Sequence, residues 1–99
     1  MNYKIVRPPL SESFSLPLKE VLLKLKIGDL VKIMFKPEAG EVERMWVQIT
    51  KMEDISEWTA KLDNDPVTEK MKEAVKAGDE VIFHPYDIIQ IWTESVSIC

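Results

Sequence analysis

From Leu30 onward the chain alternates apolar and polar residues in short runs, and this pattern constrains the fold more than any other feature. The runs cover residues 30–35, 43–52 and 58–62, and short polar breaks separate them. A period of two sends one set of side chains into a core and the other set toward solvent. Three such runs joined by short breaks predict an antiparallel meander.

The alternation also predicts which side chains face the core. The inward set is Val31, Ile33, Phe35, Met45, Val47, Ile49, Trp58, Ala60 and Leu62. The opposite face of the second run carries Arg44, Trp46, Gln48 and Thr50. A tryptophan therefore lies on a face that is otherwise polar.

After the meander, residues 63–66 favour a turn, and residues 67–77 predict a short helix that Thr68 caps. Its apolar face is Met71, Ala74 and Val75. Residues 80–83 predict a fourth strand that Pro85 ends. Residues 86–92 predict a last strand, or a turn followed by one.

Before the meander, Leu18, Val21, Leu22 and Leu25 recur at helical spacing, so a helix is expected over residues 17–27. The fold class predicted is α+β: a strongly bent antiparallel sheet, or a small SH3-like barrel, of four or five strands, with an N-terminal helix and a short inserted helix. The 99 residues form one domain in this interpretation, with an extended arm over 1–13, a folded core over 14–92 and a frayed tail over 93–99.

Composition excludes several kinds of chemistry. One cysteine, Cys99, permits no internal disulfide and no cysteine-rich zinc site, and one histidine, His84, is too few for most metal centres. Three dispersed glycines form no phosphate-binding loop. We therefore expect no metal and no cofactor. The sequence has neither a bilayer-spanning apolar stretch nor a signal-peptide pattern, so we expect a cytoplasmic protein without membrane contacts.

One segment of the chain echoes another. Residues 25–33 and 75–83 both follow the pattern apolar-Lys-apolar-Gly-Asp-x-Val-x-apolar. The glycine suits a positive φ, and the aspartate can bond nearby backbone N–H groups. Duplicated ligand loops are one interpretation, and two equivalent turns that lead into strands are the favoured one.

Four segments together resemble a known family: Gly40–Val47, Leu62–Pro66, Gly78–Val81 and Asp87–Trp92. They resemble the YegJ-like bacterial domain family of unknown function, over roughly residues 25–92. The most specific parts are Glu-x-Met-Trp-Val and Leu-x-Asn-x-Pro. Residues 67–76 depart from the family, because an inserted helix replaces a shorter loop. The resemblance implies a bacterial cytoplasmic domain and no particular reaction.

The main candidate for a functional residue is Trp46. An indole on the polar face of a strand often anchors a contact, whereas the alternative is that the helix over 17–27 covers Trp46 in a second core layer. The sequence favours a non-enzymatic binding module for an unidentified protein or small ligand. An immunity or accessory role in bacteria is one form it could take, by analogy. Its candidate site residues are Trp46, Arg44, Glu43, Asp63, Asn64 and Trp92.

Two other functions stay open. A small hydrolase or metal-dependent enzyme would use His84 with Glu43 or Asp63. Binding of single-stranded nucleic acid would use Lys32, Lys51 and Lys61, which simple alternation leaves on different faces. Against nucleic acid stands the charge, since 17 acidic residues outnumber 13 basic ones for a net charge of -4.

Overall fold

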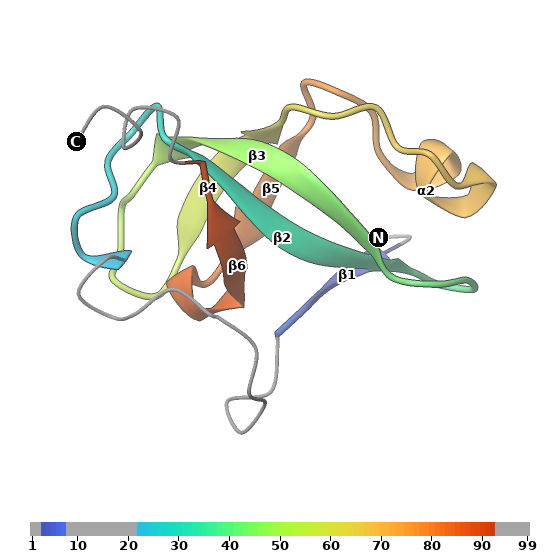
Figure 1. The fold of residues 1–99 in the computed structure, drawn as a ribbon, viewed down its shortest axis with the longest axis horizontal. Helices are drawn as coiled ribbons and strands as arrows, with labels where there is room; N and C mark the ends of the chain where they lie inside the picture. Colours follow the sequence, from blue (N-terminus) through green and yellow to red (C-terminus); the bar gives the residue numbers. More distant parts are fainter. Residues whose placement is uncertain (1–2, 8–21, 93–99) are drawn as a thin grey trace.

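A computed structural model describes residues 3–7 and 22–92, and its main feature is an antiparallel meander. Strands β2 (Leu30–Pro37), β3 (Glu43–Lys51), β4 (Trp58–Leu62) and β5 (Glu80–Phe83) pair in chain order (Figure 1). These are the strands that alternation predicts. The strongly bent antiparallel sheet expected from the sequence is confirmed as a curled half-barrel with one short helix.

Two short strands share the second edge of β2. Strand β1 (Tyr3–Val6) pairs with residues 34–37, and β6 (Ile88–Ile91) pairs with residues 31–33. A 3₁₀ helix, η1 (Pro85–Asp87), separates β5 from β6. The strand β1 lies within the predicted arm, so that part of the arm belongs to the sheet. Residues 8–13 of the arm, and the tail over 93–99, lie outside the described residues.

The inner face of the curled sheet forms one apolar core. Every residue that alternation directed inward on β2, β3 and β4 is buried, with Val31, Ile33, Phe35, Val47, Ile49 and Ala60 fully inaccessible. Leu22, Leu25, Met71 and Ile88 join this cluster from outside the meander. We call the opposite side of the sheet the outer face.

A bulge in β3 changes the face of one lysine. Ile49 pairs with Ala60 and Lys51 pairs with Thr59, so Thr50 is the extra residue. Thr59 lies between the buried Trp58 and Ala60, so it faces outward. Lys51 therefore joins Lys32 and Lys61 on the outer face, and the expectation that these lysines alternate between faces is wrong.

The two echoed segments fold into equivalent turns, as the sequence favoured. Gly28 and Gly78 have φ values of 101° and 96°. The Asp29 carboxylate accepts from the N–H of Lys26 at 2.9 Å, and Asp79 accepts from Lys76 at 3.0 Å. Both glycine N–H groups donate at 2.8 Å to a neighbouring strand, to Ile49 and Leu62 respectively. We call these the Gly-Asp turns.

Of the helix expected over residues 17–27, the structure describes residues 22–27, and residues 23–27 of these are not helical. Residues 17–21 lie outside the described part. The N–H of Leu25 donates to the carbonyl of Leu22 at 3.2 Å, which is a single turn, and no regular helix follows. The first Gly-Asp turn already uses the N–H of Lys26, so a helical hydrogen bond cannot form there. The prediction therefore extends the helix too far, because residues 23–27 form turns that still bury Leu25.

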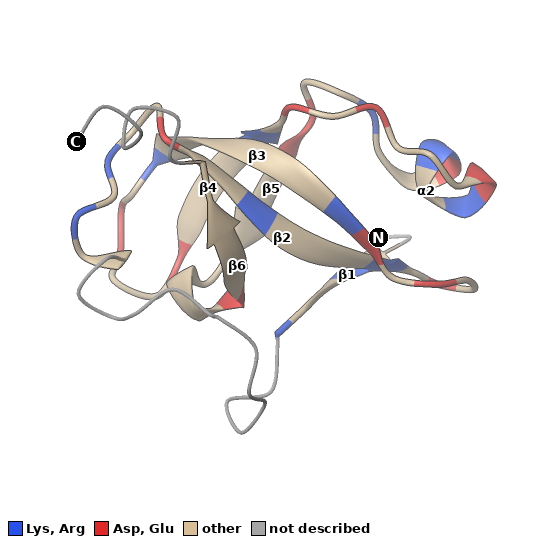
Figure 2. Ribbon diagram, in the orientation of Figure 1, with Lys and Arg blue, Asp and Glu red and all other residues tan. Residues whose placement is uncertain are grey.

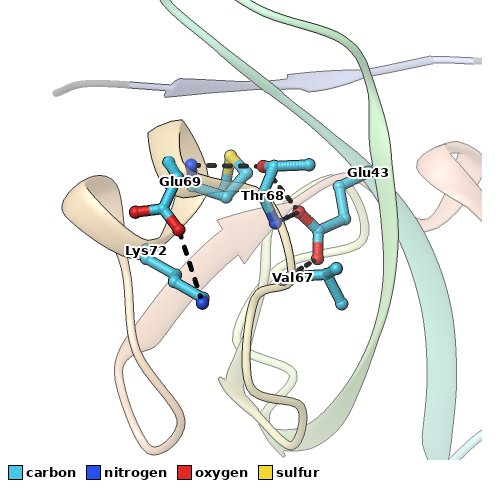
Figure 3. Close-up of polar contacts among 6 residues, drawn as sticks. Glu43, Val67, Thr68, Glu69 and Lys72 are labelled. Atoms are coloured by element: carbon cyan, nitrogen blue, oxygen red, sulfur yellow. Dashed lines mark hydrogen bonds and ion pairs between the residues drawn. The ribbon is translucent and has the colours of Figure 1, made fainter.

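The predicted short helix is confirmed as α2 (Glu69–Ala74). Thr68 is its N-cap, and its hydroxyl accepts from the N–H of Met71 at 3.4 Å. Met71 is fully buried against the core. Glu43, the first residue of β3, fixes the chain just before the helix (Figure 3). Its carboxylate accepts from the N–H of Val67 at 2.6 Å and from the Thr68 hydroxyl at 2.9 Å.

Candidate recognition face

Trp46 lies in the middle of the outer face. It is half-buried and stands opposite Lys32 of β2, which in turn stands opposite Gln90 of β6. The Lys32 ammonium lies 4.8 Å from the centroid of the Trp46 ring, so a cation–π contact holds the indole from one side. The described part of the segment predicted to cover Trp46 packs in the inner core instead.

Trp92 completes an aromatic pair with Trp46. The ring centroids are 5.4 Å apart and the ring planes meet at 85°, an edge-to-face arrangement. Trp92 follows β6 directly, and its backbone N–H donates to the carbonyl of Leu30 at 2.9 Å. It remains 51% exposed. The two indoles therefore form a corner on the solvent side of the sheet.

Asn64 holds the backbone beneath this corner. Its side-chain oxygen accepts a hydrogen bond from the backbone N–H of Trp46. The neighbouring Asp63 N–H donates to the Trp46 carbonyl at 2.9 Å. The backbone hydrogen bonds between β3 and β4 thus continue for one residue beyond the end of β4. The side-chain oxygen of Asn64 is thus engaged by the backbone of Trp46.

The other predicted site residues lie in three different surroundings. Arg44 is exposed on the outer face, opposite Met34 and two residues from Trp46. Glu43 is engaged by α2 and belongs to the structural connection described above. Asp63 lines a polar hollow of about 390 Å³ beside the Asn64 turn; its other walls include Gln48, Lys61, Asn64, Asp65 and Gly78.

The charges of the sheet are sharply segregated by sign. Acidic side chains lie mainly in loops, turns and α2, whereas Lys and Arg lie both there and on the strands (Figure 2). The described strands carry only two acidic residues, Glu43 and Glu80, and each is the first residue of its strand. Their basic residues are Lys4, Lys32, Lys36, Arg44, Lys51 and Lys61.

Four of these basic residues form a continuous strip on β1, β2 and β3. Lys4 stands opposite Lys36, Arg44 lies in the next outward-facing row, and Lys32 lies in the row that contains Trp46. We call Lys4, Lys36, Arg44 and Lys32 the basic strip. Successive rows are roughly 7 Å apart along a strand. The basic strip thus leads directly to the indole corner.

The His84 side chain caps a helix and does not meet the predicted carboxylates. Its Nδ1 accepts from the N–H of Tyr86 at 2.9 Å, while the Asp87 carboxylate accepts from the His84 N–H at 2.9 Å. Asp87 also pairs with Arg7 at 2.9 Å. His84 follows Phe83, which pairs with Trp58, and the neighbouring Thr59 pairs with Lys51 at the end of β3. Glu43 is at the start of the nine-residue β3, roughly 25 Å from Lys51 along an extended strand. Asp63 likewise follows the far end of β4.

An apolar hollow that the sequence did not indicate lies beside His84. Its volume is about 380 Å³, and its walls include Leu22, Leu23, Ile55, Trp58, His84 and Tyr86. Leu23 and Ile55 are 75% and 91% exposed. Alternation could not reveal it, because five of these six residues lie outside the strands. A neighbouring loop contains Asp54, whose pKa is lowered by hydrogen bonds from the backbone and side chain of Ser56.

Comparison with known proteins gives no relative: the chain matches no family model, no curated protein and no solved structure. In the part of the chain that the structure describes, no helix has the length and apolar character to cross a membrane. Within residues 3–7 and 22–92, no three His, Cys, Asp or Glu side chains converge as metal ligands.

The sequence missed half of the basic strip. Arg44 and Lys32 were named as candidates, but Lys4 and Lys36 were not. The outward position of Lys4 could have been inferred from alternation, since Lys4 lies between Tyr3 and Ile5, which pack against the core. What the sequence does not contain is the pairing of β1 with β2, which brings residue 4 beside residue 36.

Proposed function

We propose that this protein is a non-catalytic binding module whose partner, a protein or a small ligand, contacts the outer face at Trp46 and Trp92. The observation that carries the proposal is the edge-to-face indole pair on the side of the sheet away from the core, with Trp92 half exposed. Large exposed aromatic side chains on a rigid support dominate the free energy of many interfaces.

The surroundings of the pair support a recognition role. Trp46 belongs to a strand, and Trp92 directly follows one. Lys32 contacts the Trp46 ring, and Asn64 accepts a hydrogen bond from the Trp46 backbone N–H. A binding group that is fixed before contact loses little conformational entropy on association. Asn64 and Trp46 therefore act together, although they are 18 positions apart in the chain.

We further propose that the half-barrel is of the SH3-like type and that the chain belongs with the YegJ-like family. The connection from β5 through a 3₁₀ helix to β6, and the return of β6 to β2, support the first point. The hydrogen bonds between Glu-x-Met-Trp-Val and Leu-x-Asn-x-Pro support the second, because the two most specific segments act as one unit.

Site-specific photo-crosslinking tests the binding function. A photoreactive residue replaces Gln90, which is exposed on the outer face beside Lys32, and in a matched control it replaces Glu73 on α2. In a bacterial extract we expect the Gln90 probe to capture a partner that the Glu73 probe does not. Trp92→Ala in the Gln90 probe should abolish capture. Equal capture at both positions, or capture that survives the loss of both indoles, would contradict the proposal.

A further inference from the structure

We propose that the outer face binds single-stranded nucleic acid, with phosphates along the basic strip and a base stacked at the indole corner. This inference rests on the proposed binding function and puts a single-stranded nucleic acid in place of the protein or small-ligand partner. The net charge of the chain argued against nucleic-acid binding, but that charge is not uniformly distributed over the surface. The relevant quantity is the charge of the face that a ligand would meet.

The sign of the charge on this face is opposite to that of the whole chain. The net charge of the chain is -4, yet the basic strip contains four cations and no outward acidic side chain lies among them on β1, β2 and β3. Glu43 at the start of β3 is turned to α2, where Val67 and Thr68 donate to it. The outward side chains of these three strands therefore present no carboxylate to a polyanion, although Glu38 and Glu41 are exposed in the hairpin beyond Lys36.

The strip has the form of a track that ends at an aromatic platform. Lys36 and Lys32 are four positions apart on β2, roughly 13 Å along the strand, with Arg44 between them on β3. The Lys36 ammonium donates to the carbonyl of Gly40 at 3.3 Å, which leaves two of its three N–H donors for a ligand. A cationic groove followed by exposed aromatic rings is the arrangement that binds single strands without reading sequence.

The strip and the indole corner together favour a nucleic acid over an acidic peptide. Three of the four members of the strip are lysines. A lysine meets phosphate and carboxylate alike as a point charge, so the aromatic rings beside the strip decide between the two classes of polyanion. Exposed indoles also favour unpaired bases, because bases in a duplex are already stacked on one another.

Acidic residues limit the track on its other side. Asp63 and Asp65 line the polar hollow beside Trp46, and Glu80 stands opposite Lys61. A polyanion is repelled there, so the path runs over β1, β2 and β3 and stops at the indoles. Lys61, named from the sequence as a nucleic-acid candidate, lies on the repelling side.

Fluorescence anisotropy with the full chain tests the proposal. The probes are labelled oligo(dT) and oligo(U) of about 12 nucleotides, a length within the usual range for one small binding domain. A duplex of equal length and a labelled oligo-glutamate serve as competing classes. We expect both single strands to bind more tightly than the duplex. For three or four contacted phosphates, log K should fall with log[salt] with a slope of about -2 to -3.

Variants locate the binding on the face. Arg44→Ala and Lys36→Ala should each reduce the steepness of the salt dependence by about 0.7. Trp92→Ala should weaken binding about tenfold and leave the slope unchanged. Lys72→Ala on α2 removes the same charge away from the strip and should change neither quantity. Circular dichroism of each variant verifies that it is folded.

Three results would overturn the inference. They are the absence of oligonucleotide binding at about 50 mM salt, oligo-glutamate binding as tight as single-strand binding, and an equal loss in Lys72→Ala and Arg44→Ala. The first result together with Trp92-dependent crosslinking at Gln90 would reject nucleic acid and retain the binding module. Absence of both signals would reject the binding function itself.

Discussion

At the scale of single residues, the recognition face depends on a side chain that lies outside the sheet. Asn64 sits in the turn after β4 and accepts from the backbone N–H of Trp46 in the middle of β3. Because that N–H is partly buried, removal of the acceptor leaves it without a partner. The amide oxygen of Asn64 therefore contributes to stability and to the position of Trp46.

We predict that Asn64→Ala lowers the free energy of unfolding by about 1–3 kcal/mol, the usual cost of an unsatisfied buried donor. Asn64→Asp keeps an acceptor oxygen in the same place and should lose clearly less. Urea unfolding followed by circular dichroism measures both. Equal losses in the two variants would show that the hydrogen bond is not the cause.

Alternation predicted the outward position of Trp46, because strict period two holds from Glu43 to Ile49. It did not predict the face of Lys51, because the extra residue Thr50 shifts the register. A bulge depends on the partner strand, so nothing in the local pattern reveals it. The contact of Asn64 with Trp46 could not be predicted for the same reason, since it joins a turn to a strand 18 positions away.

At the scale of elements, α2 is connected to the sheet through one carboxylate. Glu43 accepts from two backbone N–H groups and one hydroxyl in residues 67 and 68 (Figure 3). Hydrogen bonds to a charged acceptor are stronger than those between neutral groups. Thr68, which was predicted as the cap from sequence, is thus itself held in place by β3.

We predict that Glu43→Ala lowers the free energy of unfolding by about 1–3 kcal/mol and increases hydrogen exchange over residues 67–72. Glu69→Ala removes an exposed ion pair with Lys72 at 3.7 Å and should cost less than about 0.5 kcal/mol. Exchange that is unchanged in Glu43→Ala would contradict the role of β3 in fixing α2.

The equivalence of the two Gly-Asp turns predicts similar losses of stability when either glycine is replaced by alanine. Gly28 and Gly78 share a positive φ, and a Cβ at either position would meet no atom within 4 Å. The cost of alanine is therefore conformational only, and Gly28→Ala and Gly78→Ala should each lose about 1–2 kcal/mol. Thermal unfolding of the two variants measures this. A loss at one position several times larger than the loss at the other would contradict their equivalence.

The turns were predictable because their pattern is local: a glycine, an aspartate and the following strand lie within a few positions. The C-terminal limit of the helix expected over 17–27 was not, because buried leucines at spacing three are compatible with one turn or with several. Leu22 and Leu25 are buried, as its apolar face requires. The competing bond of Lys26 to Asp29 decides the backbone instead.

At the scale of the whole molecule, Tyr3 reports on how far the sheet curls. Burial raises the pKa of the Tyr3 hydroxyl, and the negative charge of Asp79 raises it further. Tyr3 belongs to β1 and Asp79 precedes β5, which are the first and last strands of the path β1-β2-β3-β4-β5. Their interaction across the sheet is a consequence of the half-barrel shape.

This shift predicts the sign of a pH effect. Above pH 10 the unfolded chain releases the phenolic proton first, so it binds fewer protons than the folded chain. Stability should therefore fall as the pH rises from about 10 through the folded pKa. Tyr3→Phe should reduce this fall, as measured by urea unfolding at several pH values. A fall of equal size in Tyr3→Phe would contradict the assignment.

The total charge, the simplest whole-molecule property of the sequence, was the least informative about the recognition face. It is a sum over loops and strands, whereas a ligand meets one face at a time. Only the pairing of β1 with β2 and of β2 with β3 shows that the cations share a face. Topology of this kind cannot be derived from composition.

The central claim is that the indole pair lies outside the core in order to meet a partner. The most direct test is the free energy of unfolding of Trp92→Ala and Trp46→Ala, compared with that of Trp58→Ala, by circular dichroism. Trp58 is 7% exposed, and its loss should cost about 3–5 kcal/mol as for other buried aromatic residues. We predict that each outer tryptophan costs about 0.5–1.5 kcal/mol, the scale of an aromatic pair. Losses as large as that of Trp58→Ala would make the pair a second core layer and contradict the account.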